Sequence, residues 1–184
     1  DSATDTSTKD SCFAGTSAPT SSGADTAFCA GETIPSLTTF VSGTAPSGST
    51  LTFSTNSNPL VVGDHLAAPE VANPVADTYY AFYYDSVNDC ASDTLEITIV
   101  ENPIPQITSA TPDAICGPGT VTLSAQSDLS GATLNWFTVE TGGTALLTGT
   151  TITPTVTVTT TYWVEATLNG CTTPTRTELV ASLQ

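Results

Sequence analysis

Hydrophobic and polar residues alternate along much of the chain with a period of two, which is typical of strands that bury one face. In residues 120–125, for example, every second residue is apolar and the residues between them are Thr or Ser. Branched and aromatic side chains dominate these stretches, and helix signals are nearly absent. The inward positions that the pattern predicts are Leu95, Ile97, Ile99, Val121, Leu123, Ala125, Ile152, Val156 and Val158.

Turn signals separate the predicted strands at short intervals. The clearest are Ser47-Gly48-Ser49, Thr141-Gly142-Gly143-Thr144 and Leu168-Asn169-Gly170-Cys171, because Gly and Asn accept positive φ. Short strands at this spacing predict antiparallel β-sandwiches. We therefore expect an all-β fold.

The same order of features occurs twice along the chain. A Cys near a strand start is followed by an alternating strand, an aromatic strand, a second Cys and a final β-branched strand, once from Cys29 to Val100 and again from Cys116 to Ala181. Each copy has the size of a small domain. The repeat predicts one sandwich over residues 28–102 and a second over residues 103–184.

Two segments lie outside the repeated pattern. Residues 1–27 are rich in Ser and Thr with little apolar apart from Phe13, so we expect an arm or linker without a core of its own. Between the copies, Pro103 and Pro105 favour an extended and fairly stiff connection.

The composition excludes several partners. The chain has 184 residues, a net charge of −16 and only two cationic residues, Lys9 and Arg176. Binding to nucleic acid or to an anionic membrane depends on Lys and Arg, so neither is expected. The acidity favours solubility through self-repulsion, and a calcium-binding surface is the alternative.

Five cysteines suggest an oxidising, extracellular setting, because persistent disulfides need one. The symmetry of the repeat predicts one internal disulfide in each sandwich, Cys29–Cys90 and Cys116–Cys171, each worth roughly 4 kcal/mol on the chain-entropy model. Cys12 is left over and is expected to be unpaired or intermolecular. A further alternative joins Cys12 to Cys29 and leaves Cys90 free.

The second copy resembles a known family. The run from Trp136 to Leu147, the strand Thr160–Ala166 and the turn Asn169-Gly170-Cys171 are similar to bacterial immunoglobulin-like repeats of long Bacteroidota surface proteins. The resemblance covers residues 105–184 well and residues 28–101 loosely. It implies tandem immunoglobulin-like β-sandwiches in secreted, adhesin-like cargo of the type IX route.

A separate pattern of Asp residues suggests modification sites. Four triplets of Asp, Ser or Thr and a small or aliphatic residue resemble the O-glycosylation signal of Bacteroidota. The acceptors would be Ser2, Thr26, Ser86 and Thr94.

Few residues offer catalytic or metal chemistry. His65 is the only histidine, and it has neither a nucleophile elbow nor a second nitrogen ligand nearby in sequence, so we expect no enzyme and no cofactor. Calcium is the one ion the pattern leaves open, either at Asp85, Asn88 and Asp89 or at Glu101 with Asp113.

Three functions remain open at this point. The leading interpretation is a non-enzymatic extracellular spacer or interaction segment of an adhesin or filament, with neighbouring repeats as partners. The second is a filament subunit that assembles through residues 1–27. The third is a carbohydrate-binding module, in which Tyr79 and Tyr83 of the aromatic strand would stack on surface glycans.

Overall fold

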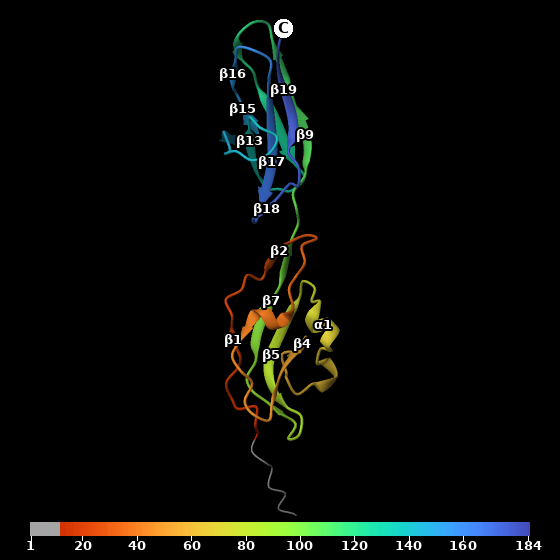
Figure 1. Cartoon of the computed structure of the whole chain (residues 1–184). Coiled ribbons are helices and arrows are strands. Elements are labelled where there is room, and N and C mark those ends of the chain that lie inside the picture. The colour runs from red at the N-terminus through yellow and green to blue at the C-terminus, as the bar shows by residue number, and fades with distance from the viewer. Residues whose placement is uncertain (1–11) are drawn as a thin grey trace, which may run out of the picture. The chain divides into compact units, whose positions relative to one another are not determined.

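The computed structural model describes residues 12–184, which form strands joined by short loops (Figure 1). The chain divides into two compact units between Glu101 and Asn102. The fold is all-β, as the alternation predicts. Within residues 12–184 the helical elements are short, and none is long and apolar enough to cross a membrane.

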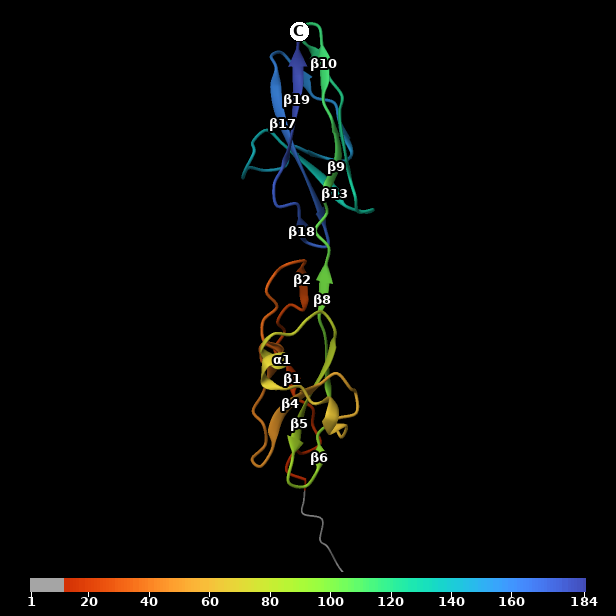
Figure 2. The ribbon, with the colours of Figure 1, turned by 90° about the vertical axis from the view of Figure 1, so that its right-hand side faces the viewer.

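In the first unit, one main sheet carries the aromatic strand. The elements are β1 (Thr20–Ser21), β2 (Ala27–Cys29), η1 (Leu37–Phe40), β3 (Val41–Ser42), β4 (Thr50–Ser54), η2 (Val62–Asp64), α1 (Ala68–Ala72), β5 (Thr78–Asp85), β6 (Cys90–Ala91), β7 (Leu95–Thr98) and β8 (Val100–Asn102). Strand β5 is central, with β4 on one side and β6 and β7 on the other. Figure 2 shows β2 lying beside β8, with which it forms a separate two-stranded sheet.

The core of the first unit lies between the main sheet and η1. Its buried members are Leu37, Phe40, Phe53, Tyr79, Ala81, Ile97 and Ile99. Ile97 and Ile99 are the inward positions that the alternation predicts, and Leu95 packs against them. A period of two therefore sets which face of β7 is buried.

Residues 12–27 are part of this unit, which corrects the expectation of an arm or linker. Ala14 is fully buried, and β1 pairs antiparallel with β3. The Ser22 N–H also donates to Phe40 O at 3.0 Å. The segment is too polar to form its own core, but its backbone groups pair with the sandwich. Residues 1–11 lie outside the described part of the chain.

The second unit is a sandwich of two sheets. Its elements are β9 (Ile107–Thr111), β10 (Asp113–Ile115), β11 (Gly119–Thr120), β12 (Leu123–Ser127), β13 (Thr133–Phe137), β14 (Leu147–Thr148), β15 (Thr151–Ile152), β16 (Thr155–Val156), β17 (Thr160–Leu168), β18 (Cys171–Thr172) and β19 (Thr177–Leu183). One main sheet has the order β15-β12-β9, and the other has the order β10-β19-β17-β13-β14 with β18 beside β17. Strands β11 and β16 form a separate two-stranded sheet.

The first strand of the second unit is split between the two sheets. Strand β9 pairs with β12, and after Pro112 the chain continues as β10, which runs parallel to β19 (Figure 2). Proline cannot donate a ladder hydrogen bond, so Pro112 suits the point where the chain changes sheets. This arrangement brings the first and last strands of the unit together.

The core of the second unit confirms most of the predicted inward positions. Its buried members are Val121, Leu123, Ala125, Leu134, Trp136, Ile152, Val156, Tyr162, Val164, Leu179 and Ala181. The prediction for Val158 is wrong, because its side chain is 65% exposed. Strand β16 ends at Val156, so the alternation has no strand to continue along.

The Asn-Gly turn forms as its sequence predicts. Asn169 and Gly170 have φ values of 49° and 83° between β17 and β18. Both residues tolerate this left-handed backbone, which suits a tight hairpin.

Gly43 of the first unit is also required, because a Cβ there would lie 2.9 Å from the Tyr83 hydroxyl.

Candidate functional site

One buried carboxylate organises the end of the first unit at which the described chain begins. Asp85 is fully buried at the end of β5. Its Oδ2 accepts hydrogen bonds from the Phe13 N–H at 3.0 Å and from Asn88 Nδ2 at 2.8 Å. Its Oδ1 accepts from the N–H groups of Val87 at 3.0 Å and Asn88 at 3.2 Å. Asp85 therefore joins residue 13 to the loop after β5.

The hydrogen bonds to Asp85 favour its ionised form. The Asn88 side-chain amide, followed by the backbone N–H groups of Phe13, Asn88 and Val87, lowers the pKa of Asp85 from 3.8 to about 2, although burial opposes the shift. The carboxylate is therefore charged at neutral pH.

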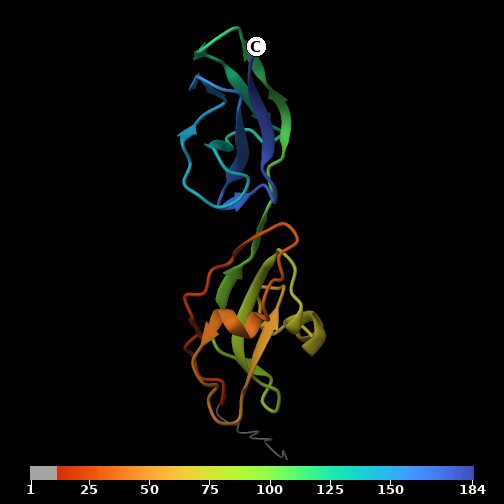
Figure 3. The ribbon, with the colours of Figure 1, turned by 45° about the horizontal axis from the view of Figure 1, so that its top comes forward.

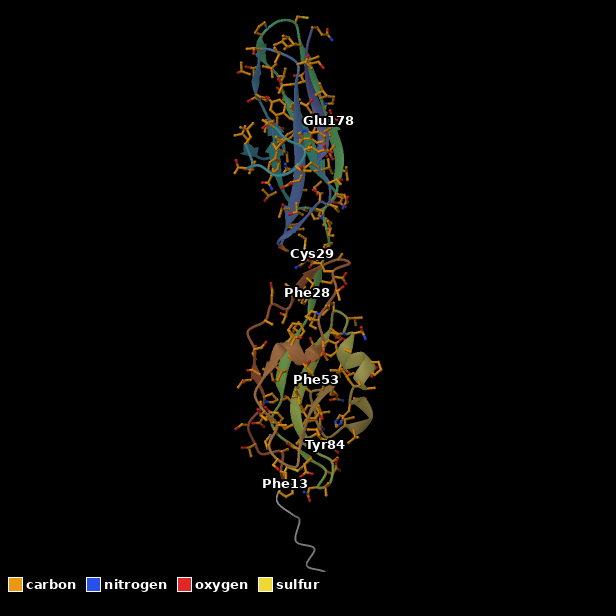
Figure 4. The ribbon with its side chains drawn as sticks, in the orientation of Figure 1. Phe13, Phe28, Cys29, Phe53, Tyr84 and Glu178 are labelled. Atoms are coloured by element: carbon orange, nitrogen blue, oxygen red, sulfur yellow. A yellow bond between two sulfur atoms is a disulfide. The ribbon has the colours of Figure 1, made fainter. Side chains whose placement is uncertain are left out.

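A disulfide closes the same end of the unit. Cys12 is bonded to Cys90, and Cys90 Sγ lies 4.0 Å from Asp85 Oδ2. We call Cys12, Phe13, Asp85, Asn88 and Cys90 the N-terminal lock. Figure 4 shows Phe13 and Tyr84 at this end of the unit, with Phe28 toward the opposite end.

The disulfide pairing corrects the prediction for the first unit. Cys90 is bonded to Cys12 instead of Cys29, and Cys12 is neither unpaired, intermolecular nor bonded to Cys29. Repeat symmetry places the start of the first sandwich at Cys29. The sandwich in fact begins upstream, and residues 12 and 90 come together at its end.

The predicted Cys116–Cys171 bond is also wrong. Cys116 is an exposed free thiol beyond the end of β10, whereas Cys29 and Cys171 are both disulfide-bonded. An internal disulfide is thus present in the first unit, with partners that differ from those expected. The predicted one in the second unit does not form.

In the second unit, the one cation of residues 12–184 holds a loop in place. Arg176 Nε donates to Glu165 Oε2 at 2.8 Å, and its guanidinium carbon lies 3.2 Å from the centroid of the Phe137 ring. Arg176 also donates to the carbonyl oxygens of Val139 and Gly142, at 2.9 Å and 2.8 Å. A planar guanidinium makes all these contacts at once, which an ammonium does not.

The Arg176 contacts decide what the adjacent pocket can do. A shallow pocket of about 250 Å³ is lined by Glu140, Glu165, Thr173 and Arg176 among others. Glu165 is engaged by Arg176 in an ion pair whose side chains are only 19% and 10% exposed. Arg176 therefore fixes the turn at residues 139–142 and engages the Glu165 carboxylate.

His65 is packed between aromatic rings. Its ring centroid lies 5.2 Å from that of Phe82 and 4.9 Å from that of Tyr84. Its Nε2 donates to the Pro59 carbonyl oxygen at 2.8 Å. The neighbouring Tyr84 hydroxyl donates to Asp89 at 2.6 Å, and this bond to Asp89 raises the pKa of Tyr84. These contacts give His65 a packing role.

Most residues of the aromatic strand β5 are buried, on both of its faces. Tyr79 and Tyr83, the predicted glycan-stacking residues, are only 5% and 7% exposed. The Tyr79 hydroxyl bonds to the Val75 backbone, and Phe82 on the opposite face is fully buried. A sugar cannot stack on rings that the protein already covers, so this prediction is corrected.

The candidate calcium ligands are occupied by donors of the protein. Asp85 accepts the four hydrogen bonds described above, and Asp89 accepts from Tyr84. Asp113 accepts from the N–H groups of Ala114 and Thr122, which lower its pKa, and Glu101 accepts from Gly31. Calcium binding therefore gains no support from these groups.

The four predicted glycosylation acceptors differ in their setting. Ser2 lies outside the described residues. Ser86 is exposed, but the Asp85 that precedes it is buried. Thr26 and Thr94 are partly exposed and follow exposed Asp residues. Modification at these positions stays a prediction.

The roles of Asp85 and Arg176 are not predicted from the sequence. A signal for each was present: an Asp followed by a turn-forming Asn at the end of a strand, and a lone Arg in an acidic chain. Neither signal names its partners, because Phe13 and Phe137 are remote from Asp85 and Arg176 in sequence.

One part of the chain matches a known family. Residues 104–184 match the model of a family described as "Ig-like domain CHU_C associated". No curated protein matches the chain.

Solved structures of multidomain proteins are also similar. Extracellular domains 3–5 of Drosophila OTK are 15% identical in sequence, with a TM-score of 0.44. The match covers 74% of this chain but only about half (52%) of that structure. A chimeric titin tandem shares 16% identity, with 86% of this chain and 94% of that one covered and a TM-score of 0.37. Three N-terminal domains of the bacteriophage RB49 Hoc protein share 18% identity, with 78% and 52% covered and a TM-score of 0.35.

We rest the fold on the strand pairing and on the family match. The order in which strands β9 to β19 pair in the two main sheets is that of an immunoglobulin-like sandwich. Residues 104–184, which make up most of the second unit, are similar to the immunoglobulin-like domains of that family.

Proposed function

We propose that this chain is a non-enzymatic spacer and interaction segment of an extracellular surface protein, such as an adhesin or filament of the Bacteroidota type. The observation that carries the proposal is the tandem of small sandwiches in which the candidate catalytic and charged side chains His65, Asp85 and Arg176 are engaged in internal contacts. His65, Asp85 and Arg176 each hold a loop to its own sandwich. Immunoglobulin-like families are generally non-enzymatic.

The cysteines support the extracellular setting. Four of the five cysteines are in disulfides, which persist in oxidising compartments. The net charge of −16 adds solubility and disfavours binding to anionic surfaces.

The strand order of the second unit suits a load-bearing role. Strands β10 and β19 are parallel and adjacent, with Ala114 opposite Ser182. Pulling on the two ends of the unit draws these strands in opposite directions along their length, which loads their hydrogen bonds together. Beyond β10 the ladder continues, because the Gln184 N–H donates to Ile115 O at 2.9 Å and the Gly117 N–H donates to Gln184 O at 3.2 Å.

Two other candidate functions lack a supporting observation. Filament assembly through an arm of residues 1–27 is not supported, because residues 12–27 belong to the first sandwich. Glycan binding loses Tyr79 and Tyr83, which are buried.

Single-molecule force spectroscopy tests the proposal. We expect the second unit to unfold in one event that releases about 3.5 Å per residue. Ile115→Pro removes a backbone N–H from β10 and is expected to lower the unfolding force of that event. Val158→Pro is the matched control, because Val158 is exposed and lies outside the strands. A second unit that extends without a force peak, or equal forces in both variants, would contradict a load-bearing spacer.

A further inference from the structure

The first unit has an open sheet edge next to an apolar groove. Strand β4 pairs with β5 on one side, and no strand of residues 12–184 pairs with its other side. A groove of about 340 Å³ lies along this open edge, lined by Leu51, Phe53, Leu66, Ala68 and Val71 among others. We call it the β4 groove. In Figure 3, α1 in yellow stands to the side of β4, away from the sheet.

The matching edge in the second unit is filled by the chain itself. Strand β13 corresponds to β4, and β14 pairs with it through Asn135–Thr148 and Trp136–Leu147. Two flanking bonds extend the ladder, from the Leu146 N–H to Trp136 O at 2.6 Å and from the Gly149 N–H to Leu134 O at 2.9 Å. The second unit shows that this edge accommodates an added strand.

The first unit forms only the first hydrogen bond of the corresponding strand pairing. The Leu66 N–H donates to Phe53 O at 2.8 Å, just as the Leu146 N–H donates to Trp136 O. After Leu66, however, the chain turns into α1, with Pro69 in its first turn and the Glu70 carboxylate bonded to the Ala67 N–H. Proline has no N–H to give to a neighbouring strand, so the edge is left open before Phe53, at Leu51, while Ser54 is still bridged to His65.

The register shows which backbone groups face the groove. Because Phe53 O points away from β5 toward Leu66, the backbone of Leu51, two residues earlier, points the same way. Tyr83, opposite Leu51, agrees with this, since its O accepts from the Ser92 N–H on the far side of β5. Leu51 thus presents an N–H and a C=O to the groove, with apolar side chains beside them.

The negative charge of the first unit indicates which kind of ligand suits the β4 groove. Residues 12–101 carry ten Asp and Glu and no Lys or Arg. Asp64 and Glu70 are exposed on the segment that borders the groove. A second copy of this chain has the same acidic character, so repulsion disfavours it. A cationic segment with apolar residues at alternate positions suits both the charge and the pleat of an added strand.

We propose that the β4 groove binds an extended cationic peptide segment of another protein, which adds to the sheet as a strand beside β4. The segment donates a backbone hydrogen bond to Leu51 O and accepts one from the Leu51 N–H. Its apolar side chains pack on Phe53, Leu66 and Val71, and its Lys or Arg side chains face the surrounding carboxylates. The first unit is thereby an interaction module as well as a spacer.

Fluorescence polarisation with a labelled peptide of alternating Lys and Val tests the proposal on the full chain. We expect binding that is absent for the same peptide with Glu in place of Lys. Raising the salt concentration to about 1 M is expected to weaken binding, because the Debye length shrinks to about 3 Å. Val71→Arg is expected to weaken binding about tenfold or more, because it places bulk and positive charge in the groove.

Val87→Arg is the matched control, since it adds the same charge at an exposed site that does not line the groove. It is expected to retain most of the affinity, and a circular dichroism melt of each variant checks folding. Hydrogen exchange gives an independent readout, because the Leu51 amide is expected to gain protection only with the Lys peptide.

Three results would overturn the proposal. The first is failure of the Lys peptide to protect Leu51. The second is equal loss of binding in both Arg variants. The third is protection of the Leu51 amide from hydrogen exchange in the free protein. Self-association, or residues 67–70 covering the open edge of β4, would produce this result. The force experiment on the second unit reads out the spacer role separately.

Discussion

Single charged side chains in this protein hold loops in place. Asp85 illustrates this, because four donors from residues 13, 87 and 88 surround its carboxylate. Arg176 does the same for the turn that contains Val139 and Gly142. In each case a charge is kept at low exposure because several hydrogen bonds compensate its loss of water.

The lowered pKa of Asp85 predicts how stability depends on acid. Its folded pKa of about 2 lies below its usual value of 3.8, so ionised Asp85 stabilises the fold above the usual value. That contribution is lost as the pH falls through this window. Thermal melts of the wild type are therefore expected to drop in midpoint between about pH 4 and pH 2.

Asp85→Asn is expected to lower the melting midpoint at pH 7 and to flatten this acid dependence, because an amide presents N–H groups to donors. Asp93→Asn removes the same charge from an exposed position and serves as the control. Identical acid profiles for Asp85→Asn and the wild type would show that Asp85 does not supply the dependence.

Strand pairing decides which elements of the first unit are covered. The segment from Cys12 to Thr26 has little apolar character, yet β1 pairs with β3, and the Cys12–Cys90 bond joins the segment to the hairpin after β5. In the main sheet, β4 lacks the partner that β13 has in β14. The upstream segment is thus paired within the first unit, whereas one edge of β4 is open.

The Cys12–Cys90 bond is expected to stabilise the first unit substantially. It closes a loop of 78 residues, for which the chain-entropy model gives about 4 kcal/mol. The double variant Cys12→Ser, Cys90→Ser is therefore expected to lose about that much free energy of unfolding. The measurement is urea unfolding, monitored by the exchange of amide hydrogens in the first unit. Replacing both residues avoids the effects of a reductant on Cys29 and Cys171.

Cys116→Ser is the control for this comparison, because Cys116 is an exposed free thiol. We expect it to change stability by less than about 0.5 kcal/mol. A double variant as stable as the wild type would show that the lock does not depend on its disulfide.

On the scale of the whole chain, each unit has its own core and its own sheets. The buried clusters around Phe53 and around Trp136 share no residue. Each unit is small, so a single core residue is a large part of its net stability.

Trp136→Ala is expected to destabilise the second unit by about 3–5 kcal/mol. Trp136 is fully buried, and its Nε1 donates to Gly149 O at 2.8 Å. Hydrogen exchange in increasing urea is expected to show earlier loss of protection in the second unit and little change in the first. Val158→Ala, at an exposed site, is the control. Equal loss of protection in both units would refute separate cores.

The amino-acid sequence by itself determined the all-β class, the two units and most inward positions. It could do so because a period of two and Asn-Gly turns are local properties of a strand and a hairpin. Val121, Leu123, Ala125, Ile97 and Ile99 are buried for this reason.

Only the tertiary structure decided which distant residues meet. Repeat symmetry predicted Cys29–Cys90, but the upstream segment brings Cys12 to Cys90 instead. Likewise, nothing local to Tyr79 and Tyr83 shows that both faces of β5 are covered, or that Asp85 would bond to Phe13. The open edge of β4 also depends on where the chain goes after Leu66, and that path is set by packing across the unit and not by strand periodicity.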